Sequence, residues 1–158
     1  MEITLPISSI IVIAIGSVGV TVSIFVGFLL LSQKDKKHIS ISLLASLLIL
    51  SGLTLLNDIL VTSGISNRIK QLYFIPIYYS LSIAPLFYLF IKSKFKYRLE
   101  KSDFTHLLIP VIHAIVYFSF GFRSIAYKSI LYNGNAFRTY LQIESFLFPI
   151  SLDLFFYF

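Results

Sequence analysis

The feature that most constrains this chain is a run of 25 residues, 7–31, that contains no charged side chain. A helix of that length, at about 1.5 Å per residue, is long enough to cross the hydrocarbon core of a bilayer, which is about 30 Å thick. The run follows Glu2 and is not preceded by the cluster of cations that opens a cleaved secretory signal. We therefore predict a retained membrane-spanning helix.

Four further apolar runs follow, at residues 39–63, 72–91, 105–122 and 139–158. The chain is 57% hydrophobic and 13% charged, with a mean hydropathy of +0.88. Water-soluble domains average about 45–50% apolar and about 25% charged residues. The sequence therefore predicts one all-α domain over residues 1–158, a polytopic helical membrane protein with about five transmembrane helices.

The cations lie between the apolar runs, and cytoplasmic loops of membrane proteins are enriched in Lys and Arg. The richest cluster is a basic loop made of Lys92, Lys94, Lys96, Arg98 and Lys101. Alternate connections carry eight cations on one side and five on the other, which predicts the amino terminus outside and the carboxyl terminus in the cytoplasm. Because the basic loop joins two predicted spans, we expect it to contact anionic headgroups, and we expect no direct nucleic-acid binding.

Proline occurs in each of the last three runs, where it removes a backbone donor and kinks a membrane helix. The predicted kinks are at Pro76, Pro85, Pro110 and Pro149. All ten Tyr and fourteen of the sixteen Phe also lie after Leu72. Since a freed carbonyl in lipid needs a partner from a neighbouring helix, we expect these three helices to pack as a bundle.

Small residues recur every four positions in the first run, at Gly19, Ser23 and Gly27. Such a stripe lets a second helix approach closely. We expect it to pack against a helix of the same chain, and the alternative is the interface of a homodimer.

Polar side chains inside the apolar runs are expensive in lipid and are candidates for function. The predicted ligand-sensing set is Asn57, Asp58, His113, Glu144 and Asp153. Structural alternatives exist: Asp58 is near its helix end and could pair with Arg68, Glu144 could pair with Arg138, and His113 could bond across helices. No zinc-protease, P-loop or nucleophile-elbow motif occurs, and with no cysteine and no metal-ligand spacing we expect no cofactor, no metal and no enzyme activity.

Three stretches together suggest a family: YFIPIYY at residues 73–79, APLFYLFIKS at 84–93 and DFTHLLIP at 103–110. Their order resembles the membrane-embedded amino-terminal region of bacterial AraC-type helix-turn-helix transcriptional regulators, best over residues 72–118. The resemblance implies a multi-pass protein of the bacterial cytoplasmic membrane. It also implies a cytoplasmic DNA-binding domain after the spans, which this sequence does not contain. Since the sequence stops inside an apolar run at Phe158, we expect a truncated chain.

The sequence thus favours a sensor or anchor module of a transcriptional regulator, with the lipid bilayer as its first partner. A second copy, or another membrane or cytoplasmic protein, is a further possible partner, and the sequence does not identify the ligand. Two alternatives stay open: a small integral subunit of a transporter or assembly complex, and the sensor part of a histidine-kinase-type receptor. Five spans without an internal repeat count against a transporter, because many transporters are built from paired repeats.

Overall fold

The computed structural model of this chain describes residues 6–33, 39–95 and 99–134, together with Thr139 and Gln142. The longer helices in these residues are α1 (Ile7–Ser32), α2 (Ile39–Thr62), α4 (Ser80–Phe95), α5 (Leu108–Gly121) and α6 (Ile125–Asn133). The shorter elements are α3 (Ile65–Arg68) and the 3-10 helices η1 (Lys70–Leu72) and η2 (Lys101–Leu107). Every regular element in the described residues is helical, so the all-α class is confirmed for this part of the chain.

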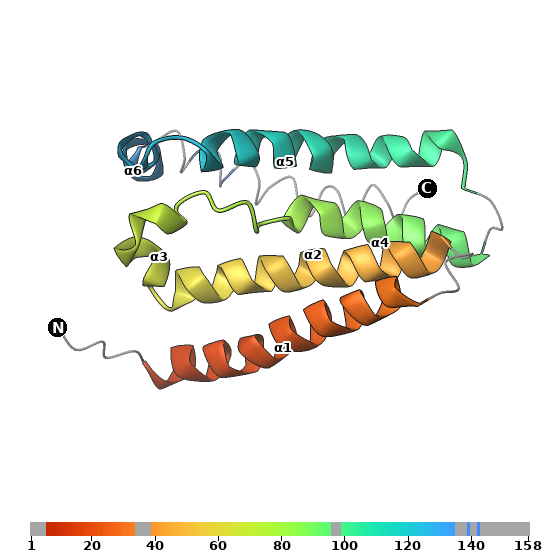
Figure 1. Cartoon of the computed structure of the whole chain (residues 1–158), viewed down its shortest axis with the longest axis horizontal. Coiled ribbons are helices and arrows are strands. Elements are labelled where there is room, and N and C mark those ends of the chain that lie inside the picture. The colour runs from red at the N-terminus through yellow and green to blue at the C-terminus, as the bar shows by residue number, and fades with distance from the viewer. Residues whose placement is uncertain (1–5, 34–38, 96–98, 135–138, 140–141, 143–158) are drawn as a thin grey trace.

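The helices α1, α2, α4 and α5 lie side by side and run in alternating directions (Figure 1). α2 packs against both α1 and α4, and α4 contacts η2 and α5. The elements α3, η1 and α6 gather at the end of the bundle where α1 begins. α1 and α4 end, and α2 and η2 begin, at the opposite end.

Among the described residues, three helical segments are long and apolar enough to cross a membrane. They are Ile7–Ser32, Ile39–Thr62 and the continuous η2–α5 unit, Lys101–Gly121. These segments match the predicted runs at 7–31, 39–63 and 105–122, with the last one starting four residues earlier than predicted. The fifth predicted run, 139–158, lies outside the described residues except for Thr139 and Gln142.

The predicted start of the third helix is wrong. α4 begins at Ser80, and residues 73–79 form irregular turns instead of helix. Pro76 has no N–H to donate, and Phe74 has a φ of 56°, and both features interrupt a helix. Pro76 therefore precedes the helix and kinks nothing, whereas Pro85 does lie inside α4. With 16 residues, α4 is about 24 Å long, shorter than a full bilayer crossing.

Kinks are also predicted at Pro110 and Pro149. Pro110 is the third residue of α5, at the point where the 3-10 geometry of η2 changes to an α-helix. A proline is well tolerated in a first turn because its missing N–H has no partner there. Pro110 thus marks the start of α5 and is not a kink in the middle of a helix. Pro149 lies outside the described residues.

The segment 123–138, which joins the last two predicted apolar runs and would be an external loop in the predicted orientation, contains a helix. α6 runs from Ile125 to Asn133, and its amino terminus is capped by the Ser124 hydroxyl, which accepts a hydrogen bond from the backbone N–H of Tyr127 at 3.4 Å. Serine is among the preferred residues at this position. A charge count along the chain shows only the cations of this segment and misses its helical pattern.

The small residues of α1 lie against α2. A Cβ added at Gly19 would come within 2.9 Å of a leucine side chain of α2, and one added at Gly27 would lie 3.1 Å from the carbonyl oxygen of Ala45. Ser23 lies opposite Gly52, where a built Cβ would be 3.2 Å from the Ser23 Cβ. The face formed by Gly19, Ser23 and Gly27 is therefore occupied by α2 of the same chain.

Candidate functional site

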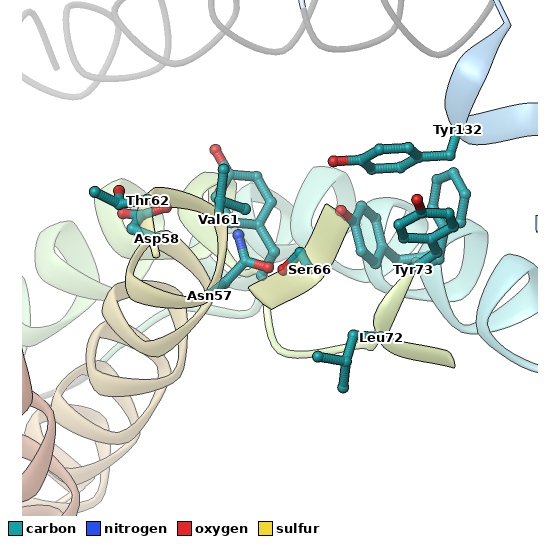
Figure 2. A pocket seen from close by; sticks show the side chains of 11 residues that line it. Asn57, Asp58, Val61, Thr62, Ser66, Leu72, Tyr73 and Tyr132 are labelled. Carbon is teal, nitrogen blue, oxygen red and sulfur yellow. The ribbon is translucent and has the colours of Figure 1, made fainter. Parts of the chain in front are cut away.

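A cavity of about 340 Å³ lies at the end of the bundle that carries α3 and α6 (Figure 2). Its polar lining consists of Asn57, Asp58, Thr62 and Ser66. The first three residues come from the last two turns of α2, and Ser66 comes from α3. In Figure 2, Asp58 and Thr62 lie on one side, Tyr73 lies on the other, and Asn57 lies between them.

Aromatic rings from three segments form most of the remaining wall, namely Tyr73, Phe74, Tyr78, Tyr117 and Tyr132. Tyr73 and Tyr132 stack with their ring centroids 4.0 Å apart and their planes at 7°. Phe74 meets Tyr117 edge-on at 6.0 Å. Each such pair stabilises by about 0.5–1.5 kcal/mol beyond the burial of its area. The rings therefore hold the turn before α4 against α5 and α6.

The backbone of Phe74 is in the left-handed region, with a φ of 56°. A bulky residue in this region stores about 1–3 kcal/mol of strain. The carbonyl oxygen of Phe74 approaches Gly121 of α5 so closely that an added Cβ would lie 2.9 Å from it. Any larger residue at position 121 would have to displace the turn or α5, and the burial of the Phe74 ring against Tyr117 offsets the strain.

A threonine of α2 fixes the start of α4. The backbone N–H of Tyr79 donates to the Thr54 hydroxyl at 3.0 Å, and that hydroxyl donates to the carbonyl oxygen of Leu50, also at 3.0 Å. The Tyr79 hydroxyl donates to the carbonyl oxygen of Pro76 at 2.6 Å. Because Thr54 is buried, this contact positions the aromatic turn relative to the polar end of α2.

Two of the five predicted ligand-sensing residues line the cavity, Asn57 and Asp58. Asp58 is exposed, and within the described part of the chain no ion pair joins it to Arg68. Glu144 and Asp153 lie outside the described residues. The structure thus places this pair, adjacent in the second predicted span, at the cavity.

His113 does not line the cavity but lies behind its wall. The side chain is buried, and its ring centroid is 5.5 Å from that of Tyr117 and 6.4 Å from that of Tyr78. Both tyrosines line the cavity. His113 therefore contacts the site through aromatic side chains.

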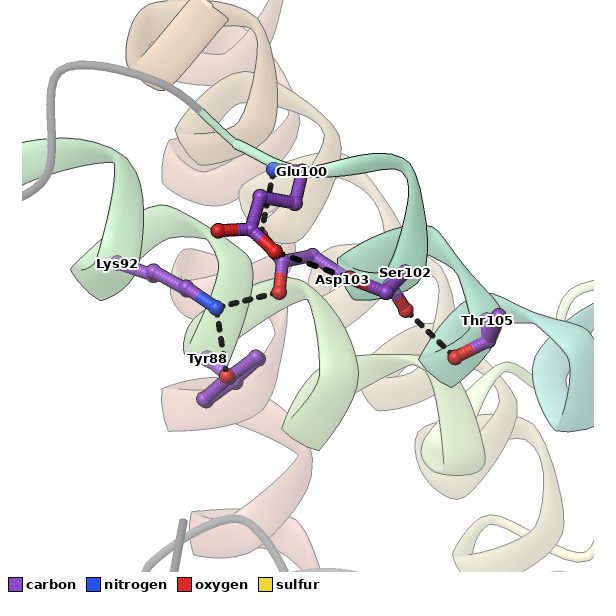
Figure 3. A network of polar contacts seen from close by, with 6 residues as sticks. All are labelled: Tyr88, Lys92, Glu100, Ser102, Asp103 and Thr105. Carbon is purple, nitrogen blue, oxygen red and sulfur yellow. Dashed lines mark hydrogen bonds and ion pairs between the residues drawn. The ribbon is translucent and has the colours of Figure 1, made fainter.

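A second polar cluster lies at the opposite end of the bundle (Figure 3). Lys92 of α4 forms an ion pair with Asp103 of η2 and donates a hydrogen bond to the Tyr88 hydroxyl at 3.3 Å. Asp103 is only 4% exposed and accepts a hydrogen bond from the backbone N–H of Glu100 at 2.8 Å. The Glu100 carboxylate in turn accepts from the backbone of Asp103, so the two residues form a reciprocal cap. This cluster ties the beginning of η2 to the end of α4.

The predicted basic loop is partly helical. Lys92 and Lys94 lie in the last turn of α4, where cations complement the negative end of the helix dipole. Lys101 is the first residue of η2 and is exposed. Lys96 and Arg98 lie outside the described residues.

The cavity offers groups for recognition: a carboxylate, a carboxamide, several hydroxyls and aromatic rings. Burial raises the pKa of the Tyr132 hydroxyl, and Tyr73 adds a smaller increase in the same direction, so the Tyr132 hydroxyl stays protonated at neutral pH. Within the described residues, no group of three or more His, Cys, Asp or Glu side chains could hold a metal ion. The arrangement is suited to holding a small ligand.

Reasoning from the sequence missed the aromatic wall. The candidate residues were polar side chains inside apolar runs. The tyrosines were not among them, because tyrosine is common at membrane interfaces. A signal was present, since the first tyrosine of the chain is Tyr73 and all ten follow from there. Nothing in the sequence indicates that the Thr54 hydroxyl binds the backbone at the start of α4.

No protein-family model matches this chain, and no curated protein or solved structure matches it either.

Proposed function

We propose that this chain is a membrane-embedded sensing module of a bacterial transcriptional regulator of the AraC type. The observation that carries the proposal is the cavity of about 340 Å³, in which the polar end of α2 faces a wall of tyrosines. Its volume lies within the range of small-molecule pockets, about 300–1,000 Å³. The stretch that resembles the regulators, 72–118, supplies four of the five aromatic rings in the wall.

Insertion in a membrane is supported by the apolar side chains that the bundle leaves exposed, and the resemblance to the regulators implies that this membrane is the bacterial cytoplasmic one. On α1, Ile7, Ile15, Val18 and Phe25 are each more than 60% exposed. A soluble protein rarely exposes so extended an apolar face, whereas hydrocarbon accommodates it. The charge count favours the basic end of the bundle in the cytoplasm and the cavity on the outer side.

Sensing requires that a ligand bind one packing of the helices more tightly than another. The make-up of the wall supports this, because its residues come from α2, α3, η1, the turn before α4, α5 and α6. A bound ligand that contacts Asn57 and Tyr132 stabilises the arrangement in which these elements lie together. At the other end of the η2–α5 unit, Asp103 pairs with Lys92 of α4, and this ion pair is the contact through which a shift of α5 would reach the end of the bundle that we assign to the cytoplasm.

The orientation is tested by single cysteines, since the natural chain has none. Lys70→Cys and Lys94→Cys place a thiol at exposed positions at opposite ends of the bundle. In intact cells we expect a membrane-impermeant maleimide to label Lys70→Cys, and to label Lys94→Cys only after the membrane is permeabilised. The reverse pattern would refute the orientation, and labelling of both in the soluble fraction would refute membrane insertion.

The regulatory role is tested by transcript profiles of the source cell. Strains carrying a deletion of the gene, Asp58→Asn or Ser119→Ala are compared, with membrane levels of the protein checked by immunoblot. We expect the deletion and Asp58→Asn to change an overlapping set of transcripts, and Ser119→Ala, an exposed position on α5, to change none. Unaltered transcripts in the deletion strain would refute the role and favour a subunit of a transporter or assembly complex.

A further inference from the structure

The charge on the described lining of the cavity is negative and comes from one side chain. Among the described residues that line it, Asp58 is the single carboxylic acid, and none is Lys, Arg or His. An anionic ligand would meet a carboxylate without a compensating cation, which is unfavourable at short range. The lining therefore selects for a neutral or a positively charged ligand.

The aromatic wall favours a positively charged ligand over a neutral one. Five rings line the cavity, and the face of an aromatic ring attracts an organic cation by about 0.5–2 kcal/mol, more when water is excluded. Three of these rings, Tyr73, Phe74 and Tyr117, are buried and fixed by their mutual contacts. A cation thus meets a preformed surface and does not have to order it.

A metal ion does not fit this lining. Calcium takes six to eight oxygen ligands, usually from several carboxylates, and the described lining supplies one carboxylate, that of Asp58. Aromatic rings contribute nothing to the coordination of a hard cation, whereas they suit a methylated or alkylated nitrogen. The combination of one carboxylate with several rings is the chemistry that recognises quaternary ammonium groups.

We propose that this cavity binds an organic ammonium group, with Asp58 supplying the counter-charge and the aromatic wall supplying ring surface, to which Tyr132 adds the face that its stack with Tyr73 leaves uncovered. The inference deepens the proposed sensing function and rests on it for the consequence of binding. The ammonium group has two chemical sources, a soluble amine or the headgroup of a lipid. Both present the same charged nitrogen to the same lining.

Binding is measured with the full chain in nanodiscs of phosphatidylglycerol, a lipid without an ammonium group. The probe is radiolabelled choline in a scintillation proximity assay, and the competitor is 3,3-dimethylbutan-1-ol, its uncharged isostere. We expect saturable choline binding and at least tenfold weaker competition by the isostere. The absence of choline binding, or equal competition by the isostere, would overturn the proposal.

Variants assign the binding to this cavity. We expect Asp58→Asn and Tyr132→Leu each to weaken choline binding about tenfold, Tyr132→Phe to stay within about threefold because the ring is kept, and Ser119→Ala to bind as the natural chain does. The near-ultraviolet circular dichroism of the tyrosines verifies the fold of each variant. Folded Asp58→Asn with natural affinity would place the bound choline elsewhere and refute the site.

A second arm uses nanodiscs of phosphatidylcholine. Loss of choline binding there identifies a lipid headgroup as the occupant, and equal binding in both lipids identifies a soluble amine, so either result supports ammonium recognition. This assay does not depend on transcription. Choline binding without a transcript change would remove the regulatory role alone, and a transcript change without choline binding would remove the ammonium ligand alone.

Discussion

The contact between Gly121 and the aromatic turn gives a sharp prediction for Gly121→Ala. A Cβ built at this position lies 2.9 Å from the carbonyl oxygen of Phe74 and 3.6 Å from the Pro76 ring. Carbon and oxygen atoms in close contact normally lie about 3.3–3.6 Å apart. The new methyl group therefore has to displace the turn by about half an ångström or push α5 away.

The turn has little freedom to move. Phe74 is already strained at a φ of 56°, and its ring is buried against Tyr117 and Tyr132. Inserting a methyl group into such a contact costs about 1–3 kcal/mol. Alanine returns up to about 1 kcal/mol through its better helix propensity, so we expect a net loss of stability of about 1 kcal/mol, concentrated in the aromatic wall.

The assay is thermal unfolding of the purified chain in detergent, followed by the near-ultraviolet circular dichroism of its ten tyrosines. A loss of 1 kcal/mol lowers the midpoint by about 2–4 °C in a chain of this size. Ser119→Ala is the matched control, because it improves helix propensity on α5 and adds no bulk. A midpoint for Gly121→Ala equal to or above that of Ser119→Ala would refute the argument from close contact.

Three further perturbations test other contacts. Thr54→Val removes the acceptor of the Tyr79 N–H, and a buried donor left without a partner costs about 1–3 kcal/mol, so its thermal midpoint should fall below that of Thr54→Ser; equal midpoints would contradict the role of the hydroxyl. Gly27→Ala places a methyl group 3.1 Å from the Ala45 carbonyl oxygen and should lower the midpoint through poorer α1–α2 packing, whereas a rise would show that α1 moves without cost. Asp103→Asn breaks the ion pair with the lysine of α4, and hydrogen exchange should become faster at η2; unchanged exchange would show that the cap alone holds it.

The first two helices could be predicted closely because their cause is local. Residues 7–31 contain no charge, and the charged segment that follows them marks the end of the run. The predicted ends of the second run, 39–63, agree with α2 (Ile39–Thr62) because Gly64, at a φ of 72°, reverses the chain there. For both helices, the hydropathy along the chain is sufficient to locate the apolar run that becomes the helix.

The start of α4 could not be predicted in this way. Its hydropathy continues without a break from Leu72. Pro76 and the left-handed backbone of Phe74 interrupt a helix before Ser80, and the Tyr79 N–H binds Thr54, which lies 25 residues earlier. A tertiary contact of this kind leaves no periodic pattern in the local sequence. The same holds for the site: Asn57 and Asp58 stand out as polar groups in an apolar run, but the tyrosines opposite them become a wall only when the turn is in place.

The η2–α5 unit is held at both ends by contacts of different kinds. At its Lys101 end the buried Asp103 pairs with α4, and at its Gly121 end the helix backbone meets the strained turn at Phe74. The ion pair is directional and is independent of the cavity, whereas the Phe74 contact is part of the cavity wall. A ligand that favours one arrangement of the wall therefore favours one position of the Gly121 end, while the Lys101 end stays attached to α4. The proposed sensing function depends on this difference between the two ends, because a ligand acts only through its unequal affinity for two packings, and the Gly121 end is the part of the η2–α5 unit that meets the cavity wall.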